Sequence, residues 1–355
     1  MPEIVLAHDY LVQCGGAERV VAHWASAFGA RTLYTLAYSP EGTFAEFRDL
    51  EVRPSIRGSL TAQVERLLPA LPSIAARTSV TGGDVALVSS SGWAHRFAYE
   101  IPHVVYVHSP ARWLYAASDY RMRLSPLRRA GLWASTPLLR HGDREAMRRA
   151  HSVIANSVVT RDRIREAYGL DAEVVNPPVE PVSAEARAPR HPLPDAFTLC
   201  VARDRGYKNI ALAVSASRAA GLPIVLAGSG SEHLDRPGEG VHGLGRVTDA
   251  ELAWLYRRAE VVIGSGREDF GLTIVEAALE GTPAAVVPAG GYLETVSPGV
   301  NGFHAASATA DGLAAAILAA RELDPAWSRD WARRFSLAAH IDKIEGVLED
   351  VAQRA

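Results

Sequence analysis

The chain alternates short β-branched, apolar runs with longer segments of helical spacing, and it does so in both halves. In the first half the apolar runs are "EIVLAHDYL", "DVALVSS", "HVVYVHS" and "SVIANS". In the second half they are "FTLCVAR", "PIVLAGSG", "EVVIGSG" and "PAAVVPA". Continuous apolar strands separated by helices are typical of parallel sheets covered on both faces. The sequence therefore predicts an α/β protein with two doubly wound, Rossmann-like domains.

A proline-rich stretch separates the two halves. Residues 176–197, "NPPVEPVSAEARAPRHPLPDAF", carry more proline than a helix or a strand tolerates. We therefore expect a first domain over 1–178, a linker over 179–196 and a second domain over 197–334. Ligands of open parallel sheets bind beyond the carboxyl ends of the strands. Two such domains would face each other across a cleft, and the residues that end each strand are the candidates for a site.

Composition excludes several classes of function. A net charge of −3 gives no field that would attract nucleic acid, and two distant cysteines give no disulfide framework. We find no Asp-x-Asp pair, no His/Cys cluster at ligand spacing and no complete GxGxxG, so we expect neither a metal site nor a dehydrogenase. The N-terminus has no signal-peptide pattern, and no run approaches the ~20 apolar residues of a membrane span. We expect a cytoplasmic protein.

One part of the first half is basic. Residues 112–149 carry nine arginines against three acids, and residues 55–80 mix arginines with leucines at roughly helical spacing. Solvated helix faces explain such a pattern. A surface for anionic lipid at the inner membrane face, or for an anionic acceptor, explains it equally well.

Three strand ends carry residues suited to an anionic ligand. A strand is expected to end at His8–Asp9, and Gly15 and Gly16 follow just before a helix, where the backbone can approach a phosphate. His108 ends the strand "HVVYV". Arg203 and Lys208 follow "FTLCV" and suit a diphosphate. Each feature also has an ordinary explanation, as a tight turn, a structural histidine or surface charge.

The segment "GREDFGLTIVEAALEG", residues 266–281, holds two acids eight positions apart. Thr273 and Glu276 form the T-x-x-E pattern of a capping box, which predicts a helix over about 273–280. Glu268 lies outside that helix and has no such structural explanation. The first-turn N–H groups of residues 271–273 would bind an anion beside these carboxylates. A sugar nucleotide offers both hydroxyls and phosphates.

These motifs resemble those of the retaining, GT-B-fold sugar-nucleotide glycosyltransferases of glycosyltransferase family four. The similarity runs nearly end to end and rests on E-x7-E in "EDFGLTIVE", R-x4-K in "ARDRGYK" and the N-terminal "GGAER". "HDYLVQCGGAERV" and "YVHSPARWLY" are most similar to the bacterial mannosyltransferase-like branch that builds surface polysaccharides. The C-terminal residues 335–355 resemble the helix that crosses back onto the first domain.

The resemblance implies a role for each matching residue. Glu268 would bind donor-sugar hydroxyls, and Glu276 would bind the nucleotide ribose. Arg203 and Lys208 would hold the diphosphate, and His108 would contact the donor sugar near the reacting carbon. The remaining donor contacts would come from backbone or from the border of the base: Gly15, Gly16, Arg246, Phe270, Gly271 and Leu272.

The resemblance also implies transfer of a hexose, with GDP-mannose as the first expected donor, to a glycan or lipid-linked acceptor without a metal cofactor. The donor would be a substrate, either GDP-mannose or a UDP-sugar. Alternatives are a glycosyltransferase acting on a soluble natural product, a sugar-nucleotide epimerase on the same fold and a non-catalytic nucleotide-sugar binding module. Sequence alone leaves the donor base, the acceptor and the linkage open.

Overall fold

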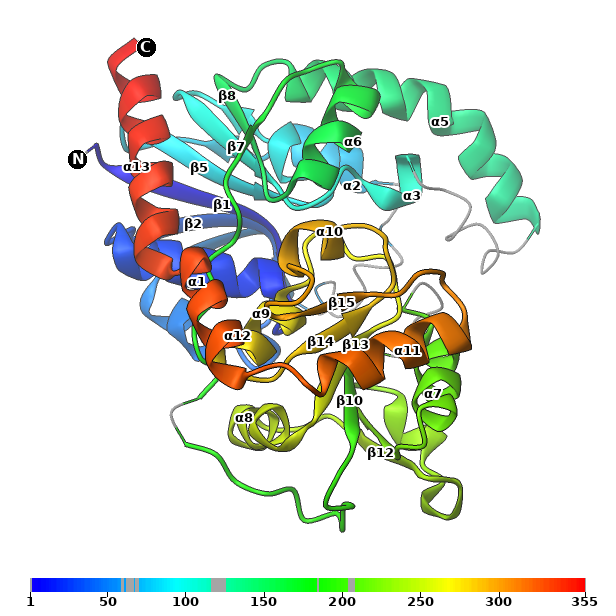
Figure 1. Cartoon of the computed structure of the whole chain (residues 1–355). Coiled ribbons are helices and arrows are strands. Elements are labelled where there is room, and N and C mark those ends of the chain that lie inside the picture. Colours follow the sequence, from blue (N-terminus) through cyan, green and yellow to red (C-terminus); the bar gives the residue numbers. More distant parts are fainter. Residues whose placement is uncertain are drawn as a thin grey trace. The chain divides into compact units, whose positions relative to one another are not determined.

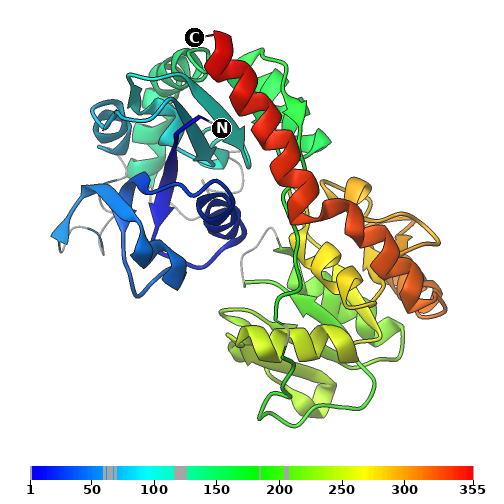
Figure 2. The same cartoon turned by 90° about the vertical axis from the view of Figure 1, so that its left-hand side faces the viewer.

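The computed structural model describes residues 2–58, 61, 67, 70–115, 126–183, 185–203 and 208–354. Within these ranges the chain divides into two compact units (Figures 1 and 2). The first unit comprises Met1–Pro177 with Ala338–Ala355, and the second comprises Pro178–Leu337. From Pro178 onward the proline-rich stretch belongs to the second unit, where Val182 and Leu193 pack in the core and the Arg187 amide donates a hydrogen bond to the Ala250 carbonyl (3.0 Å).

The first unit is built on a seven-stranded parallel sheet with the order β3-β2-β1-β5-β7-β8-β9. The strands of this sheet are β1 (Ile4–Leu11), β2 (Thr32–Tyr38), β3 (Glu51–Ile56), β5 (Val85–Ser90), β7 (His103–Val107), β8 (Ser152–Ala155) and β9 (Glu173–Val174). A two-stranded parallel sheet is added by β4 (Ser79–Val80) and β6 (Ala98–Tyr99). The α-helices of the unit are α1 (Gly16–Ala27), α2 (Leu71–Ala76), α3 (Arg112–Tyr115), α5 (Pro126–Met147), α6 (Val158–Tyr168) and α13 (Leu337–Arg354).

The C-terminal helix α13 is part of the first unit. Figures 1 and 2 both show it, in red, running along that unit. Ile344, Leu348 and Val351 are buried in the same core cluster as the apolar residues of β1 and β5. The Trp24 indole donates a hydrogen bond to Nε2 of His340 (2.8 Å), and His340 Nδ1 donates to the Asn176 carbonyl (2.8 Å). Packing and these two hydrogen bonds hold α13 in place.

The second unit has a six-stranded parallel sheet with the order β12-β11-β10-β13-β14-β15. Its strands are β10 (Thr198–Val201), β11 (Ile224–Ala227), β12 (Val241–Gly245), β13 (Val261–Gly264), β14 (Ala284–Val286) and β15 (Gly302–His304). Its α-helices are α7 (Ile210–Ala219), α8 (Asp249–Arg258), α9 (Leu272–Leu279), α10 (Tyr292–Thr295), α11 (Ala310–Ala320) and α12 (Pro325–Ala332). The described residues also form short 3₁₀ turns: η1 (Ala45–Asp49), η3 (Ala94–Arg96), η5 (Ser231–Leu234), η6 (Pro237–Glu239) and η7 (Arg333–Phe335).

Each sheet is covered by apolar side chains on both faces. Alternate residues of one strand enter different core clusters: Val5 and Ala7 of β1 lie in one, and Ile4 and Leu6 lie in the other. The second sheet is divided in the same way, with Leu199 and Cys200 of β10 in different clusters. The prediction of two doubly wound α/β domains is confirmed, since continuous apolar strands are buried on both sides.

In both sheets the order in which successive strands are added reverses at one internal point. Numbered within its own unit, the second sheet has the order 3-2-1-4-5-6, and the first has the same order with one more strand. In such sheets the connections diverge between strands 1 and 4, and a crevice for ligands opens there at the carboxyl ends. That point lies between β10 and β13 in the second unit and between β1 and β5 in the first.

Candidate functional site

The switch point of the second sheet joins two of the predicted site residues. Lys208 follows β10, Glu268 follows β13, and the Lys208 Nζ contacts the Glu268 carboxylate in a charge-assisted hydrogen bond. Each side chain is 19% exposed, so the pair is largely shielded yet still open to solvent. The Ser265 hydroxyl also donates to the Lys208 carbonyl (3.0 Å), which ties the two strand-end loops together. These residues meet although 60 positions separate them in sequence.

Arg203 and Arg246 extend the same edge of the sheet. Arg203 follows β10 and is half-buried, whereas Arg246 directly follows the outer strand β12 and is exposed. Residues 204–207, which complete the R-x4-K motif between Arg203 and Lys208, lie outside the described residues. Arg203, Lys208 and Arg246 therefore place positive charge at the ends of β10 and β12.

A loop after β14 that contains Gly290 and Gly291 contacts the backbone of Glu268. The Gly291 amide donates to the Glu268 carbonyl (2.9 Å). Gly290 has φ +66°, and a Cβ there would overlap that same carbonyl oxygen; a Cβ at Gly291 would overlap the Phe270 backbone. Only glycine allows this close approach of two backbones. The 290–291 loop was not recognised in the sequence, and G-G after the run "PAAVVPA" is the signal that marks it.

The capping box predicted at Thr273 and Glu276 is wrong. Helix α9 begins at Leu272, its N-cap is Gly271 in the left-handed region (φ 98°, ψ 50°), and no side chain caps it. Thr273 is therefore already the second residue of the helix. The predicted span of 273–280 was late by one residue at each end, because a glycine in the left-handed region starts the helix earlier than the T-x-x-E pattern indicates.

Glu276 has a different partner. Its Oε2 accepts a hydrogen bond from the hydroxyl of Tyr256 (2.8 Å), a side chain of α8 that is itself fully buried. Glu276 is half-buried on α9. Its carboxylate therefore forms no capping box with Thr273 and accepts the Tyr256 hydrogen bond instead. Tyr256 was missed in the sequence, where it reads as an ordinary apolar position of "ELAWLYRRA".

The predicted backbone donors lie around the start of α9. Phe270 and Gly271 are buried, and Leu272 is the first helical residue. Gly271 packs against the ring of Tyr292 in α10, which leaves about 3.0 Å for any Cβ at that position. A helix start without a side-chain cap leaves its first amides to be satisfied by water or by a ligand. Helix α9 begins four residues after Glu268 in the chain.

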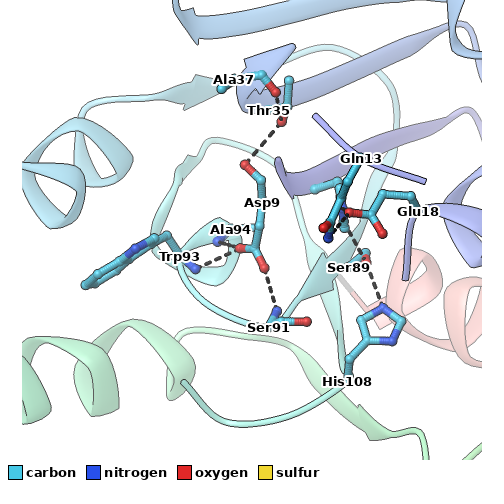
Figure 3. A network of polar contacts seen from close by, with 11 residues as sticks. Asp9, Gln13, Glu18, Thr35, Ala37, Ser89, Ser91, Trp93, Ala94 and His108 are labelled. Atoms are coloured by element: carbon cyan, nitrogen blue, oxygen red, sulfur yellow. Dashed lines mark hydrogen bonds and ion pairs between the residues drawn. The ribbon is translucent and has the colours of Figure 1, made fainter. Parts of the chain in front are cut away.

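The first unit places a second polar cluster at its own switch point, between β1 and β5 (Figure 3). The Asp9 carboxylate accepts backbone hydrogen bonds from Ser91 (2.6 Å), Trp93 (2.7 Å) and Ala94 (2.6 Å). Strand β1 continues past the expected end at His8–Asp9 as far as Leu11, because it pairs with β2 up to Tyr38. Asp9 is thus a buried strand residue that fixes the turn after β5.

His108 joins this cluster through Ser89. Nε2 of His108 lies 2.8 Å from the Ser89 hydroxyl, and Nδ1 of His8 lies 2.9 Å from the same oxygen. Burial, with a contribution from neighbouring His8, lowers the pKa of His108 to about 3, so its ring is neutral near pH 7. His108 was recognised in the sequence, whereas Ser89 was missed because it reads as a polar residue near the end of the run "DVALVSS".

The two glycines at the start of α1 lie close to an acid. Gly15 is the N-cap of α1 and Gly16 its first residue. Glu18, buried in the first turn, lies so close that a Cβ on Gly15 would be 2.5 Å from its Oε2. The space beside Gly15 is therefore occupied by the Glu18 carboxylate, so a diphosphate at this turn would meet an acid as well as the helix N-terminus.

Among the described ranges, no three His, Cys, Asp or Glu side chains gather into a metal-binding group. Within the same ranges, none of the helices combines the length and the apolar character that a bilayer span requires.

Two family models divide the chain between them. The model described as Glycosyltransferase Family 4 matches residues 14–182, and the model described as Glycosyl transferases group 1 matches residues 183–333. None of the curated proteins compared matches the chain.

Solved structures of similar fold cover almost the whole chain. HepE of Anabaena, in complex with UDP and glucose, has a TM-score of 0.70 at 20% identity and covers 98% of this chain and 100% of its own. Sucrose-phosphate synthase of Thermosynechococcus elongatus has a TM-score of 0.65 at 18% identity, covering 99% and 100%. The lipopolysaccharide outer core galactosyltransferase WaaB in its apo form has 0.64 at 13%, covering 98% and 99%. With the two domain matches and this shared fold, the chain is a GT-B glycosyltransferase, built from a Glycosyltransferase Family 4 domain and a glycosyl transferases group 1 domain.

Proposed function

We propose that the enzyme transfers a hexose from a nucleoside diphosphate sugar to a glycan or lipid-linked acceptor, with retention of the anomeric configuration. The observation that carries this proposal is the meeting of Lys208 and Glu268 at the switch point of the second sheet. A cation there suits the diphosphate, and a carboxylate suits sugar hydroxyls.

In this proposal the donor separates Lys208 from Glu268 and contacts both side chains. The Lys208 ammonium, together with Arg203, neutralises the diphosphate, and the start of α9 adds backbone N–H groups. Glu268 accepts hydrogen bonds from the sugar hydroxyls. Glu276, already positioned by Tyr256 (2.8 Å), accepts hydrogen bonds from the ribose diol. Arg246 borders the base at the end of β12.

The chemistry needs charge stabilisation more than a nucleophile. The bond between the anomeric carbon and the diphosphate oxygen breaks, and the acceptor hydroxyl oxygen bonds to the same face of that carbon. The acceptor proton passes to an oxygen of the leaving diphosphate. Negative charge that develops on the diphosphate is stabilised by Lys208 and Arg203, and in this proposal no metal ion takes part. We therefore expect that an excess of EDTA leaves the rate of transfer unchanged.

The donor is the least determined part of the proposal. The sequence resemblance favours GDP-mannose, whereas the HepE structures contain UDP, glucose or UDP-glucose. We therefore propose a nucleoside diphosphate hexose and test both bases. Each ¹³C-labelled donor would be incubated with the enzyme, with and without candidate glycan acceptors, and followed by NMR.

The NMR experiment separates the proposal from its alternatives. A new anomeric signal with the donor's configuration, formed only with acceptor, supports retaining transfer. Conversion of the donor without acceptor points to an epimerase. Tight binding of the donor without turnover under any condition would show a binding module and overturn the proposal.

For the acceptor, we propose that the basic part of the first unit contacts anionic lipid. Within the described residues, α5 carries a groove of about 400 Å³ lined by Thr136, Pro137, Arg140, His141, Arg144 and Arg148. Arg140 and Arg144 also bond to the carbonyls of Leu114 and Ala167. Residues 59–60, 62–66, 68–69 and 116–125 of the two basic segments lie outside the described ranges. Arg148→Glu should weaken binding to vesicles containing phosphatidylglycerol at low salt; no binding of the unaltered enzyme would contradict the proposal.

A further inference from the structure

The Glu276 carboxylate is bonded to a buried tyrosine of a neighbouring helix. The hydroxyl of Tyr256 donates a hydrogen bond to Oε2 of Glu276 (2.8 Å), although 20 positions separate the two residues. Tyr256 is fully buried, in the same core cluster as Leu255 and Ile274. Its ring therefore lies in the core of the second unit, while its hydroxyl reaches a carboxylate that is only half-buried.

The surroundings of Tyr256 fix the direction of its hydroxyl. Close packing in a protein core restricts the ring to one orientation. The main chain is held as well, because the Thr282 hydroxyl donates a hydrogen bond to the Tyr256 carbonyl. Thr282 is a buried residue between α9 and β14. The hydroxyl that reaches Glu276 is therefore attached to a densely packed part of the second unit.

The side chain of Glu276 depends on such a partner for its order. A glutamate side chain rotates about several bonds, and a half-buried one on a helix has more than one accessible rotamer. Immobilising one side chain of this kind on binding weakens affinity by about two- to tenfold. A hydrogen bond to a charged acceptor is stronger than one between neutral groups, so Tyr256 can hold the carboxylate in place before a ligand arrives.

A carboxylate held in this way can still bind a diol. Its two oxygens accept hydrogen bonds at about four positions, and the bond from Tyr256 uses one of them. Two neighbouring hydroxyls that each donate a hydrogen bond match the two oxygens of one carboxylate. The orientation of Glu276 therefore determines whether both hydroxyls of a diol are bound at once.

We infer that Tyr256 is a positioning residue that orients the Glu276 carboxylate towards the two ribose hydroxyls of the donor. This inference rests on the proposed function, which supplies the identity of the ligand. Since its ring is fully buried, Tyr256 acts through Glu276 and not by touching the ligand. Its loss should affect ligands that carry the ribose diol and spare ligands that lack it.

The experiment is a calorimetric titration of the unaltered enzyme and of Tyr256→Phe with UDP, GDP and ADP and with their 2′,3′-dideoxy forms. For the base that binds, we expect Tyr256→Phe to weaken binding of the nucleoside diphosphate about two- to tenfold. Binding of the dideoxy form should change less than about twofold. In a Glu276→Ala background, Tyr256→Phe should have no further effect, because the residue through which it acts is gone.

Thr282→Val is the matched control. It removes the hydroxyl that bonds to the Tyr256 carbonyl but keeps the hydrogen bond from the Tyr256 hydroxyl to Glu276. Both variants should be less stable in urea, since each lacks one buried hydrogen bond. Only Tyr256→Phe should reduce the preference for the ribose form over the dideoxy form. An equal reduction in both variants would contradict the inference, because disturbed packing would then explain it.

Failure of this inference differs from failure of the proposed function. If Tyr256→Phe weakens binding of both nucleotide forms equally, or of neither, the inference is overturned while the proposed function stands. If none of the three nucleoside diphosphates binds the unaltered enzyme, the proposed function fails, and the inference fails with it.

Discussion

At the scale of single residues, substitution of Glu276 offers the clearest test of a ligand-binding role against a structural role. Its carboxylate accepts a hydrogen bond from the Tyr256 hydroxyl and forms no capping box at the start of α9. Glu276→Gln keeps an oxygen that can accept the same hydrogen bond, so the free energy of unfolding should change by less than about 1 kcal/mol. The full charge that would bind the ribose diol is lost, so donor affinity should fall about ten- to a hundredfold. Urea unfolding and calorimetric titration measure the two effects.

The control for this variant lies one turn further along the chain. Glu280 follows α9 and pairs with Arg257 (2.6 Å), away from the strand ends that carry the site. Glu280→Gln should leave donor affinity unchanged. If both variants bind donor as the unaltered enzyme does, Glu276 does not contact the ribose.

At the scale of elements, the loop after β14 determines where Glu268 lies. Gly290 and Gly299 both have positive φ, +66° and +78°, so an alanine at either position costs about 1–2 kcal/mol in backbone strain. Only Gly290→Ala also places a Cβ on the Glu268 carbonyl, since a Cβ at 299 meets nothing within 4 Å. We expect Gly290→Ala to lose about 1–3 kcal/mol more stability than Gly299→Ala.

Donor affinity of the same two variants tests the role of the loop in function. Moving the Glu268 backbone should weaken donor binding in Gly290→Ala, while Gly299→Ala binds donor normally. Equal donor affinity in the two variants would show that the loop does not position Glu268. Both quantities come from the same preparations, by urea unfolding and by calorimetric titration.

A comparison of two helix starts shows what a sequence pattern could and could not predict. T-x-x-E occurs at Thr248–Glu251 and at Thr273–Glu276. At α8 the first pattern forms a complete capping box, with both reciprocal hydrogen bonds present. At α9 the second does not, because Gly271 adopts a left-handed conformation and begins the helix two residues before Thr273 could cap it. A helix follows the pattern at both places, but the pattern gives the correct first residue only at α8.

At the scale of the whole molecule, acid should destabilise the first unit. Burial comes first among the causes that lower the pKa of His103 and His340 to about 4 and that of His108 to about 3, below an unfolded value of 6.5. The folded state then holds these rings neutral, while the unfolded chain binds their protons below pH 6.5. Their contribution is complete above pH 6.5 and is lost as the pH falls towards 4.

The slope gives the test. Each such histidine removes about 1.4 kcal/mol of stability per pH unit within that window. Urea unfolding between pH 7 and pH 4.5 should show this loss. His340→Gln should begin less stable at pH 7, because the contacts to Trp24 and Asn176 change, but should lose about 1.4 kcal/mol less per pH unit. An unchanged slope would contradict the assignment.

The architecture was more predictable than the contacts inside the site. Apolar periodicity specifies the alternation of strands and helices, and the strand ends identify Arg203, Lys208, His108 and Glu268 as candidates. Sequence does not specify which strand ends become neighbours. Lys208 reaches Glu268 across 60 positions, and His8 reaches Ser89 across 81, only because β10 pairs with β13 and β1 pairs with β5. Buried partners such as Tyr256 and Ser89 carry no local pattern that marks them.

The central claim is that the switch point of the second sheet binds the diphosphate of the donor through Lys208. The most direct measurement is a thermal-shift titration with UDP, GDP and ADP and with their hexose conjugates, since a ligand that binds only the folded state raises the Tm. The control is Lys343→Ala, which removes the chain's other lysine, an exposed residue of α13. We predict that at least one nucleoside diphosphate raises the Tm of the unaltered enzyme and of Lys343→Ala, and that the shift is lost in Lys208→Ala. An equal shift in Lys208→Ala, or no shift with any of these ligands, would contradict the claim.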